Sequence, residues 1–253
     1  MDTPLSGEEK QWQEHFNRKL EKVLEGGTYS TAFLDPRQLE LAQASLRRYS
    51  ELSYTVYGGH PQAERNALYI FPFQHQGALP PVKAIIIRWP GGNEKIGHRD
   101  LLGAVLGLGL HRDQVGDIFM LEEGGAAVMV MKSKAEYICM NLLQVGHLPV
   151  DCSACEPDQL PLVKERSKEI NGTVASLRLD SVLSLGFGAS RSKIVRLIKG
   201  GLVMVNWRPV DSPSLQLNEG DQLSLRGRGR LFISSVKGRT RKGRIHLKLK
   251  KYS

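Results

Sequence analysis

The amino-acid sequence predicts an α+β protein of two domains, and three observations support this. The first part alternates helical and strand patterns, a polar stretch with two prolines follows it, and the net charge then changes sign. Residues 1–163 carry 15 Lys and Arg against 20 Asp and Glu, whereas residues 164–253 carry 20 against 6. We expect an N-terminal domain at 1–155, a linker or hinge at 156–175 and a C-terminal domain at 176–253.

The composition is that of a globular protein, with 41% apolar and 24% charged residues. No run of 18 apolar residues occurs, so we expect no membrane span. The acidic N-terminus lacks the apolar region of a secretory signal. The three cysteines indicate a reducing compartment. We therefore expect a cytoplasmic monomer, or a protein of the plastid stroma if the source is eukaryotic.

Two helices are expected to lead the N-terminal domain. Trp12, Phe16 and Leu20 share a helical spacing within the first, at 8–25. Asp35 is placed to cap the second, at 36–49, with Pro36 at its first position. A loop should follow, running through YTVYGGHPQAERN.

The rest of this domain alternates apolar β-branched runs with helical patterns. We expect strands at 67–73, 82–89, 117–121, 126–131 and 148–152, and helices at 98–109 and 133–144. The order predicts an α+β sandwich with helices packed on one sheet.

The C-terminal domain should open with two short helices, at 179–185 and 191–199. Gly186 and Gly188 are expected to end the first, and Ser190 to cap the second. A hairpin around Asn206-Trp207 and a turn at Glu219-Gly220-Asp221 follow. Leu231–Val236 should pair with the alternating strand that ends the chain.

Cations gather on one face of the second short helix. Lys193, Arg196 and Lys199 recur at steps of three, apart from the apolar stripe of Ile194 and Ile198. A solvated charged face is the usual explanation for such a helix. Here the positive bias continues to the end of the chain, which indicates a polyanion whose phosphates these cations contact.

The stretch RLDSVLSLGFGASRSKIVRLIKGGLVMVN resembles the S4 RNA-binding domain, as does the later Glu219-Gly220-Asp221 turn. The resemblance implies an αL-type fold that binds structured RNA. It gives as RNA-facing candidates Arg178, Ser190, Arg191, Ser192, Lys193, Arg196, Lys199 and Asn206. Asp180 is expected to orient Arg178 or to cap the helix. Trp207 could stack on a base or cover the hairpin, and the neighbouring candidates are Arg208, Arg226, Arg228 and Arg230.

The segments FLDPRQ, GGHPQAER, HRDLLGAVLGLGLHRDQVGDI and RGRGR resemble the YlmH-type S4 proteins. That family implies an RRM-like N-terminal domain before the S4 domain. It also implies binding to rRNA and tRNA, including large ribosomal subunits that carry stalled peptidyl-tRNA. One branch is the photosystem II S4 domain protein of cyanobacteria and plastids, so photosystem II assembly is an alternative role.

Enzyme motifs of other S4 proteins are missing from the sequence. Asp180 lies in the S4 helix rather than in the R-L-D-x-x-T-S-G context of a pseudouridine synthase, and no P-loop or tyrosyl-tRNA synthetase motif occurs. Cys152-x-x-Cys155 lacks the second pair of a zinc site, so we expect incidental thiols rather than metal or redox chemistry. We predict no enzyme and no cofactor. The alternative is an RNA-modifying enzyme with an unrecognised site in residues 30–150.

Overall fold

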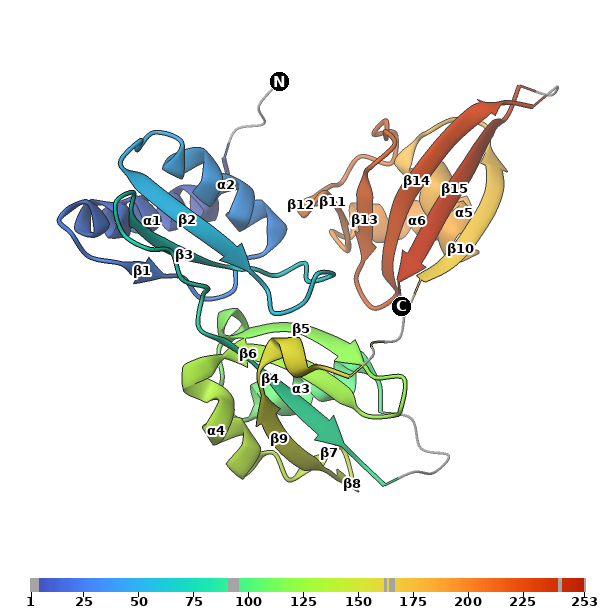
Figure 1. Cartoon of the computed structure of the whole chain (residues 1–253). Helices are drawn as coiled ribbons and strands as arrows, with labels where there is room; N and C mark the ends of the chain where they lie inside the picture. The colour runs from blue at the N-terminus through green and yellow to red at the C-terminus, as the bar shows by residue number, and fades with distance from the viewer. Residues whose placement is uncertain (1–4, 91–95, 162, 164–166, 241–242, 253) are drawn as a thin grey trace. The chain divides into compact units, whose positions relative to one another are not determined.

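The computed structural model describes residues 5–90, 96–161, 163, 167–240 and 243–252 (Figure 1). The chain forms two compact units, Met1–Lys164 and Glu165–Ser253. Within the described residues, no helix is long and apolar enough to cross a membrane.

The first unit opens with a three-stranded antiparallel sheet in the order β1-β3-β2. Its elements are α1 (Gly7–Leu24), β1 (Tyr29–Ser30), α2 (Pro36–Leu46), β2 (Leu52–Tyr57) and β3 (Ala67–Pro72). The two helices bury Phe16, Leu20 and Ala42 against Leu68 and Ile70 of the central strand. The sequence prediction of a loop at the start of YTVYGGHPQAERN was wrong, because β2 pairs with β3 along its whole length.

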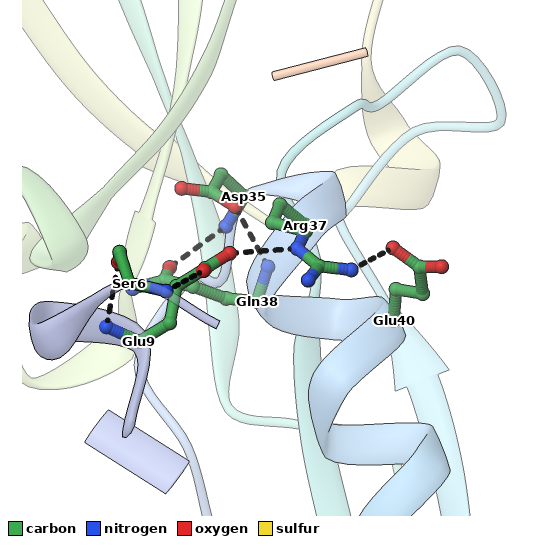
Figure 2. A network of polar contacts seen from close by, with 6 residues as sticks. All are labelled: Ser6, Glu9, Asp35, Arg37, Gln38 and Glu40. Atoms are coloured by element: carbon green, nitrogen blue, oxygen red, sulfur yellow. Dashed lines mark hydrogen bonds and ion pairs between the residues drawn. The ribbon is translucent and has the colours of Figure 1, made fainter. Parts of the chain in front are cut away.

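The starts of α1 and α2 are capped and joined by polar contacts (Figure 2). Asp35 accepts from the Gln38 backbone N–H at 2.8 Å, which confirms the predicted cap. Ser6 and Glu9 form the equivalent capping box on α1. Arg37 then donates from Nε to Glu9 at 2.7 Å, so one guanidinium ties the second helix to the first.

A second, four-stranded sheet completes the first unit, in the order β5-β6-β4-β9. Its elements are β4 (Val82–Arg88), α3 (His98–Gly107), β5 (Val115–Met120), β6 (Ala126–Met131), α4 (Lys132–Asn141) and β9 (Asp151–Cys155), with a small β7–β8 hairpin (Gln144–Val145, Leu148–Pro149) before β9. Successive side chains of β4 point to opposite faces of the sheet, and both faces are buried. Ile85 and Ile87 pack with α3 and α4, whereas Ala84 and Ile86 pack with Phe33 from the first half of the unit.

The predicted single sandwich was therefore wrong in its connectivity. The strands at 67–72 and 82–88 belong to different sheets, each with its own pair of helices. Periodicity identified the strands but carries no information on which strands pair. The RRM-like description of this unit stays a prediction.

The second unit is a six-stranded antiparallel sheet in the order β10-β15-β14-β13-β11-β12, with α5 and α6 on one face (Figure 1). The elements are β10 (Ser167–Val174), α5 (Leu179–Phe187), α6 (Arg191–Lys199), β11 (Val203–Val205), β12 (Arg208–Pro209), β13 (Gln222–Leu225), β14 (Gly229–Arg239) and β15 (Ile245–Tyr252). The linker predicted at 156–175 is shorter than expected, since residues 167–174 pair along β15. Their polar, alternating sequence reflects an edge strand with one exposed face.

Candidate nucleic-acid interface

Helix α6 separates apolar and cationic side chains onto different faces. Ser190 accepts from the Lys193 backbone N–H at 3.4 Å, which confirms the predicted cap, and Ile194 and Ile198 are fully buried. The polar side chains that the sequence placed together are all exposed: Arg191, Ser192, Lys193, Arg196 and Lys199. Within the described residues, Lys193, Arg196 and Lys199 have no acidic partner. Their charges are therefore available to an outside anion.

Asp180 anchors the arginines at the edge of this face. Its side chain is buried and accepts from Arg191 Nη2 at 2.6 Å and from Arg178 Nε at 3.4 Å. Burial alone would raise the pKa of Asp180, but the hydrogen bonds from Arg191 and Arg178 outweigh it and lower the pKa. Of the two roles considered, orienting Arg178 fits this geometry, since Asp180 caps no helix. Its contact with Arg191 was not predicted.

The β11–β12 hairpin turns through two residues with positive φ, Asn206 at 48° and Trp207 at 66°. Both angles are those of a type I′ turn, which asparagine tolerates and tryptophan adopts with strain. The Asn206 amide donates to Asp221 at 2.8 Å and accepts from the Gln222 backbone N–H at 2.9 Å. Asn206 therefore ties the hairpin to the Glu219-Gly220-Asp221 turn, with its amide nitrogen and its amide oxygen each engaged once within the unit.

Trp207 is half-buried beneath the guanidinium of Arg230, whose Cζ lies 5.9 Å from the ring centroid. Burial lowers the pKa of Arg230. Arg208 is also half-buried in β12, whereas Arg226 and Arg228 are exposed in the turn between β13 and β14. The predicted residues thus form two groups, one on α6 and one around the hairpin and β13–β14 turn.

Gly186 does not end α5 as predicted. A Cβ atom there would lie 2.2 Å from the nearest side-chain carbon of Leu231, so the helix needs glycine to approach β14 closely. Gly188 ends the helix in the left-handed conformation, with φ of 60°.

In the first unit, the segments FLDPRQ, GGHPQAER and HRDQVGDI meet at one seam. Asp117 accepts from the backbone N–H groups of Glu64 and Arg65 at 2.6 and 2.8 Å, and Arg65 donates to the Phe33 carbonyl at 3.0 Å. Burial raises the pKa of Asp117. Burial and repulsion from Arg65 lower the pKa of Arg112 to about 10. These contacts join the two sheets of the unit, and periodicity could not have found them.

The cysteine pair is divided between two faces of β9. Cys152 packs with the helix-covered core and Cys155 with the opposite core. Residues three apart on a strand point to opposite sides, so the C-x-x-C spacing does not form a chelate here. No group of three His, Cys, Asp or Glu side chains suited to a metal occurs within the described ranges.

Comparison with known proteins identifies the chain's relatives. It is 33% identical over 214 residues to the ribosome-associated protein quality control protein P2 of Bacillus subtilis, covering 84% of this chain and 82% of that protein. The chain belongs to the YlmH family. Three family models match along it, described as "YlmH, N-terminal" (23–74), "Putative RNA-binding domain in YlmH" (81–159) and "S4 domain" (177–223).

The YlmH models divide the first unit as the structure does, with the three-stranded sheet in 23–74 and the four-stranded sheet and the β7–β8 hairpin in 81–159. A solved structure, the cell division protein ylmH from Streptococcus pneumoniae, matches with a TM-score of 0.54 at 18% identity, over 64% of this chain and 99% of that one. That likeness supports the fold. The S4 domain also resembles small ribosomal subunit protein uS4B of Clostridium acetobutylicum, 38% identical over 68 residues, which are 26% of this chain and 35% of that protein. The chain is thus a homologue of a ribosome-associated quality control protein and carries an S4 domain.

Proposed function

We propose that the protein binds structured rRNA and tRNA on the large ribosomal subunit, in complexes that carry stalled peptidyl-tRNA, and that it acts by binding rather than by catalysis. The observation that carries the proposal is the exposed α6 face. Three exposed cations lie there, none with an acidic partner among the residues that the structure describes, on a helix whose other side is buried in the core. The Bacillus subtilis relative is named for association with ribosomes, which supports the ribosomal partner.

In this mechanism α6 lies along a folded RNA backbone. Lys193, Arg196 and Lys199 neutralise successive phosphates, and Asp180 holds Arg178 and Arg191 in a fixed direction beside them. Preordered arginines lose less side-chain entropy on binding than free ones. The first unit, which is net negative, would orient the protein through protein or RNA contacts of its own.

Charge reversal on α6 tests the proposal. The variant Lys193→Glu/Arg196→Glu/Lys199→Glu changes only exposed side chains and leaves the Asp180 contacts intact. The matched control, Lys10→Glu/Arg18→Glu/Lys22→Glu, makes the same charge change on exposed positions of α1. Each protein is sedimented with purified ribosomal subunits through sucrose.

The α6 variant should leave the large-subunit fraction, with affinity reduced on the order of 100-fold at physiological salt, because three phosphate contacts become repulsions. The control should stay bound. Co-sedimentation of the α6 variant at the wild-type level would refute the proposed interface.

A further inference from the structure

The sheet of the second unit has a face that its helices do not cover. Side chains alternate along β14, so the buried Leu231 and Ile233 pack toward α5 and α6, and Arg230 and Phe232 point to the other side. On β15, Lys251 lies over the Phe187 ring of α5 at 5.1 Å. Its neighbours Lys250 and Tyr252 therefore lie on the same uncovered side as Phe232.

The strand register makes aromatic rings and cations alternate on this face, both along each strand and between the two strands. Arg230 is paired with Tyr252, and Phe232 is paired with Lys250. Directly opposed side chains in an antiparallel sheet have Cβ atoms only about 4.5–5.5 Å apart. Each ring therefore has a cation across from it and another two residues along its own strand.

The pattern continues toward the hairpin edge of the sheet. Met204 of β11 is paired with Ser224, which is paired with Arg230, so one row crosses four strands to Tyr252. Trp207 lies under Arg230 at this edge, and Met204 is 41% exposed. Within the second unit, no described helix or strand lies over this face (Figure 1). We call Trp207, Arg230, Phe232, Lys250 and Tyr252 the sheet platform.

We propose that the sheet platform binds an unpaired RNA strand, with bases stacked on its rings and phosphates on its cations. Aromatic rings on an open sheet, interleaved with basic residues, suit nucleotides because every base has a π-face and every linkage an anion. Glu169 of β10 is paired with Lys250 in the strand register, but its carboxylate forms its ion pair with Lys248 at 2.8 Å. Within the described residues Lys250 has no ion pair of its own, so its charge is left for a phosphate.

This inference goes beyond the proposed function, because it assigns a second site to the same unit. The exposed α6 face offers cations without aromatic rings and so fits the backbone of folded RNA. The sheet platform offers both and so fits bases free to stack. One S4 unit could then hold a stem on its helical side and a single strand on its sheet side.

The variant Phe232→Leu/Tyr252→Leu tests the platform in the full-length protein, since leucine keeps apolar bulk and removes the ring. The control Phe73→Leu/Tyr137→Leu removes two exposed rings from the first unit. Two RNA probes are used: an unstructured oligonucleotide of about eight nucleotides with a central 2-aminopurine, matching typical single-strand site sizes, and a blunt-ended hairpin stem. Titrations follow 2-aminopurine quenching and fluorescence anisotropy.

Wild type and control should quench 2-aminopurine, and the platform variant should not. The variant should bind the single strand at least ~10-fold more weakly, as loss of base–ring stacking predicts, while its affinity for the stem stays within about twofold of wild type. Failure of the wild type to quench, or equal weakening for both probes, would overturn the platform. The two proposals fail in different ways. If the α6 proposal is wrong, the Lys193→Glu/Arg196→Glu/Lys199→Glu variant will bind the stem as tightly as wild type does.

Discussion

Replacing Asp180 with asparagine tests the anchor of the interface. The substitution keeps the shape of the side chain and removes its charge. The hydrogen bond from Arg191 is short, 2.6 Å, and should contribute more than that from Arg178, which is longer at 3.4 Å. A charged hydrogen bond contributes about 1.5–3 kcal/mol. Arg191 is 56% exposed, so solvent screening lowers the expected loss to about 1–2 kcal/mol.

The loss should appear as a fall of roughly 5–10 °C in the unfolding temperature of the second unit at pH 7. The pKa of Asp180 is lowered in the folded protein. Its ionised form therefore stabilises the fold above the unfolded pKa of about 4, and this stabilisation is lost as the pH falls through the folded pKa. The difference between wild type and Asp180→Asn should shrink below pH 4.

Thermal melts followed by circular dichroism between pH 7 and pH 3 measure both effects. Asp211→Asn is the matched control, because Asp211 is exposed and has no ion pair within the described residues. Equal melting of Asp180→Asn and wild type at pH 7, or a difference that does not change with pH, would refute the reasoning.

Three further predictions concern single side chains. Gly58→Ala should lower stability by about 1–3 kcal/mol, because its Cβ would lie 2.6 Å from the Arg65 carbonyl; an unchanged melting temperature would contradict this. Burial raises the pKa of Cys152 to about 11, so its alkylation, followed by mass spectrometry, should be slow at pH 8 and about tenfold faster per pH unit above it; rapid labelling at pH 7 would disprove this. Asn206→Ala should lower the free energy of unfolding in urea by about 1–2 kcal/mol, through loss of its bonds to Asp221 and Gln222; an unchanged unfolding midpoint would contradict this.

The sequence predicted those features that depend on residues close together in the chain, such as helix caps, the buried face of a helix and a tight turn. The α6 cap at Ser190, the buried Ile194 and Ile198 and the exposed cations all follow from spacing within one helix. The Asn206-Trp207 hairpin was likewise readable from a short stretch of sequence.

Features that depend on pairing between distant segments could not be predicted in this way. Spacing alone did not separate the two sheets of the first unit or detect the seam at Asp117. It also missed the link between Asp180 and Arg191, eleven residues apart on different helices. Nor did the motif show that the Asn206 amide, predicted to face RNA, donates to Asp221 within the unit. The contacts of the candidate residues with RNA remain predictions.

The salt dependence of RNA binding tests the central claim most directly. The logarithm of the association constant for a structured RNA is measured against the logarithm of salt concentration, for wild type and for Lys193→Glu/Arg196→Glu/Lys199→Glu. Each lost phosphate contact should reduce the slope by about one, so the variant should have a slope shallower by about three. Equal slopes for the two proteins would contradict the assignment of the α6 face as the surface that binds the RNA backbone.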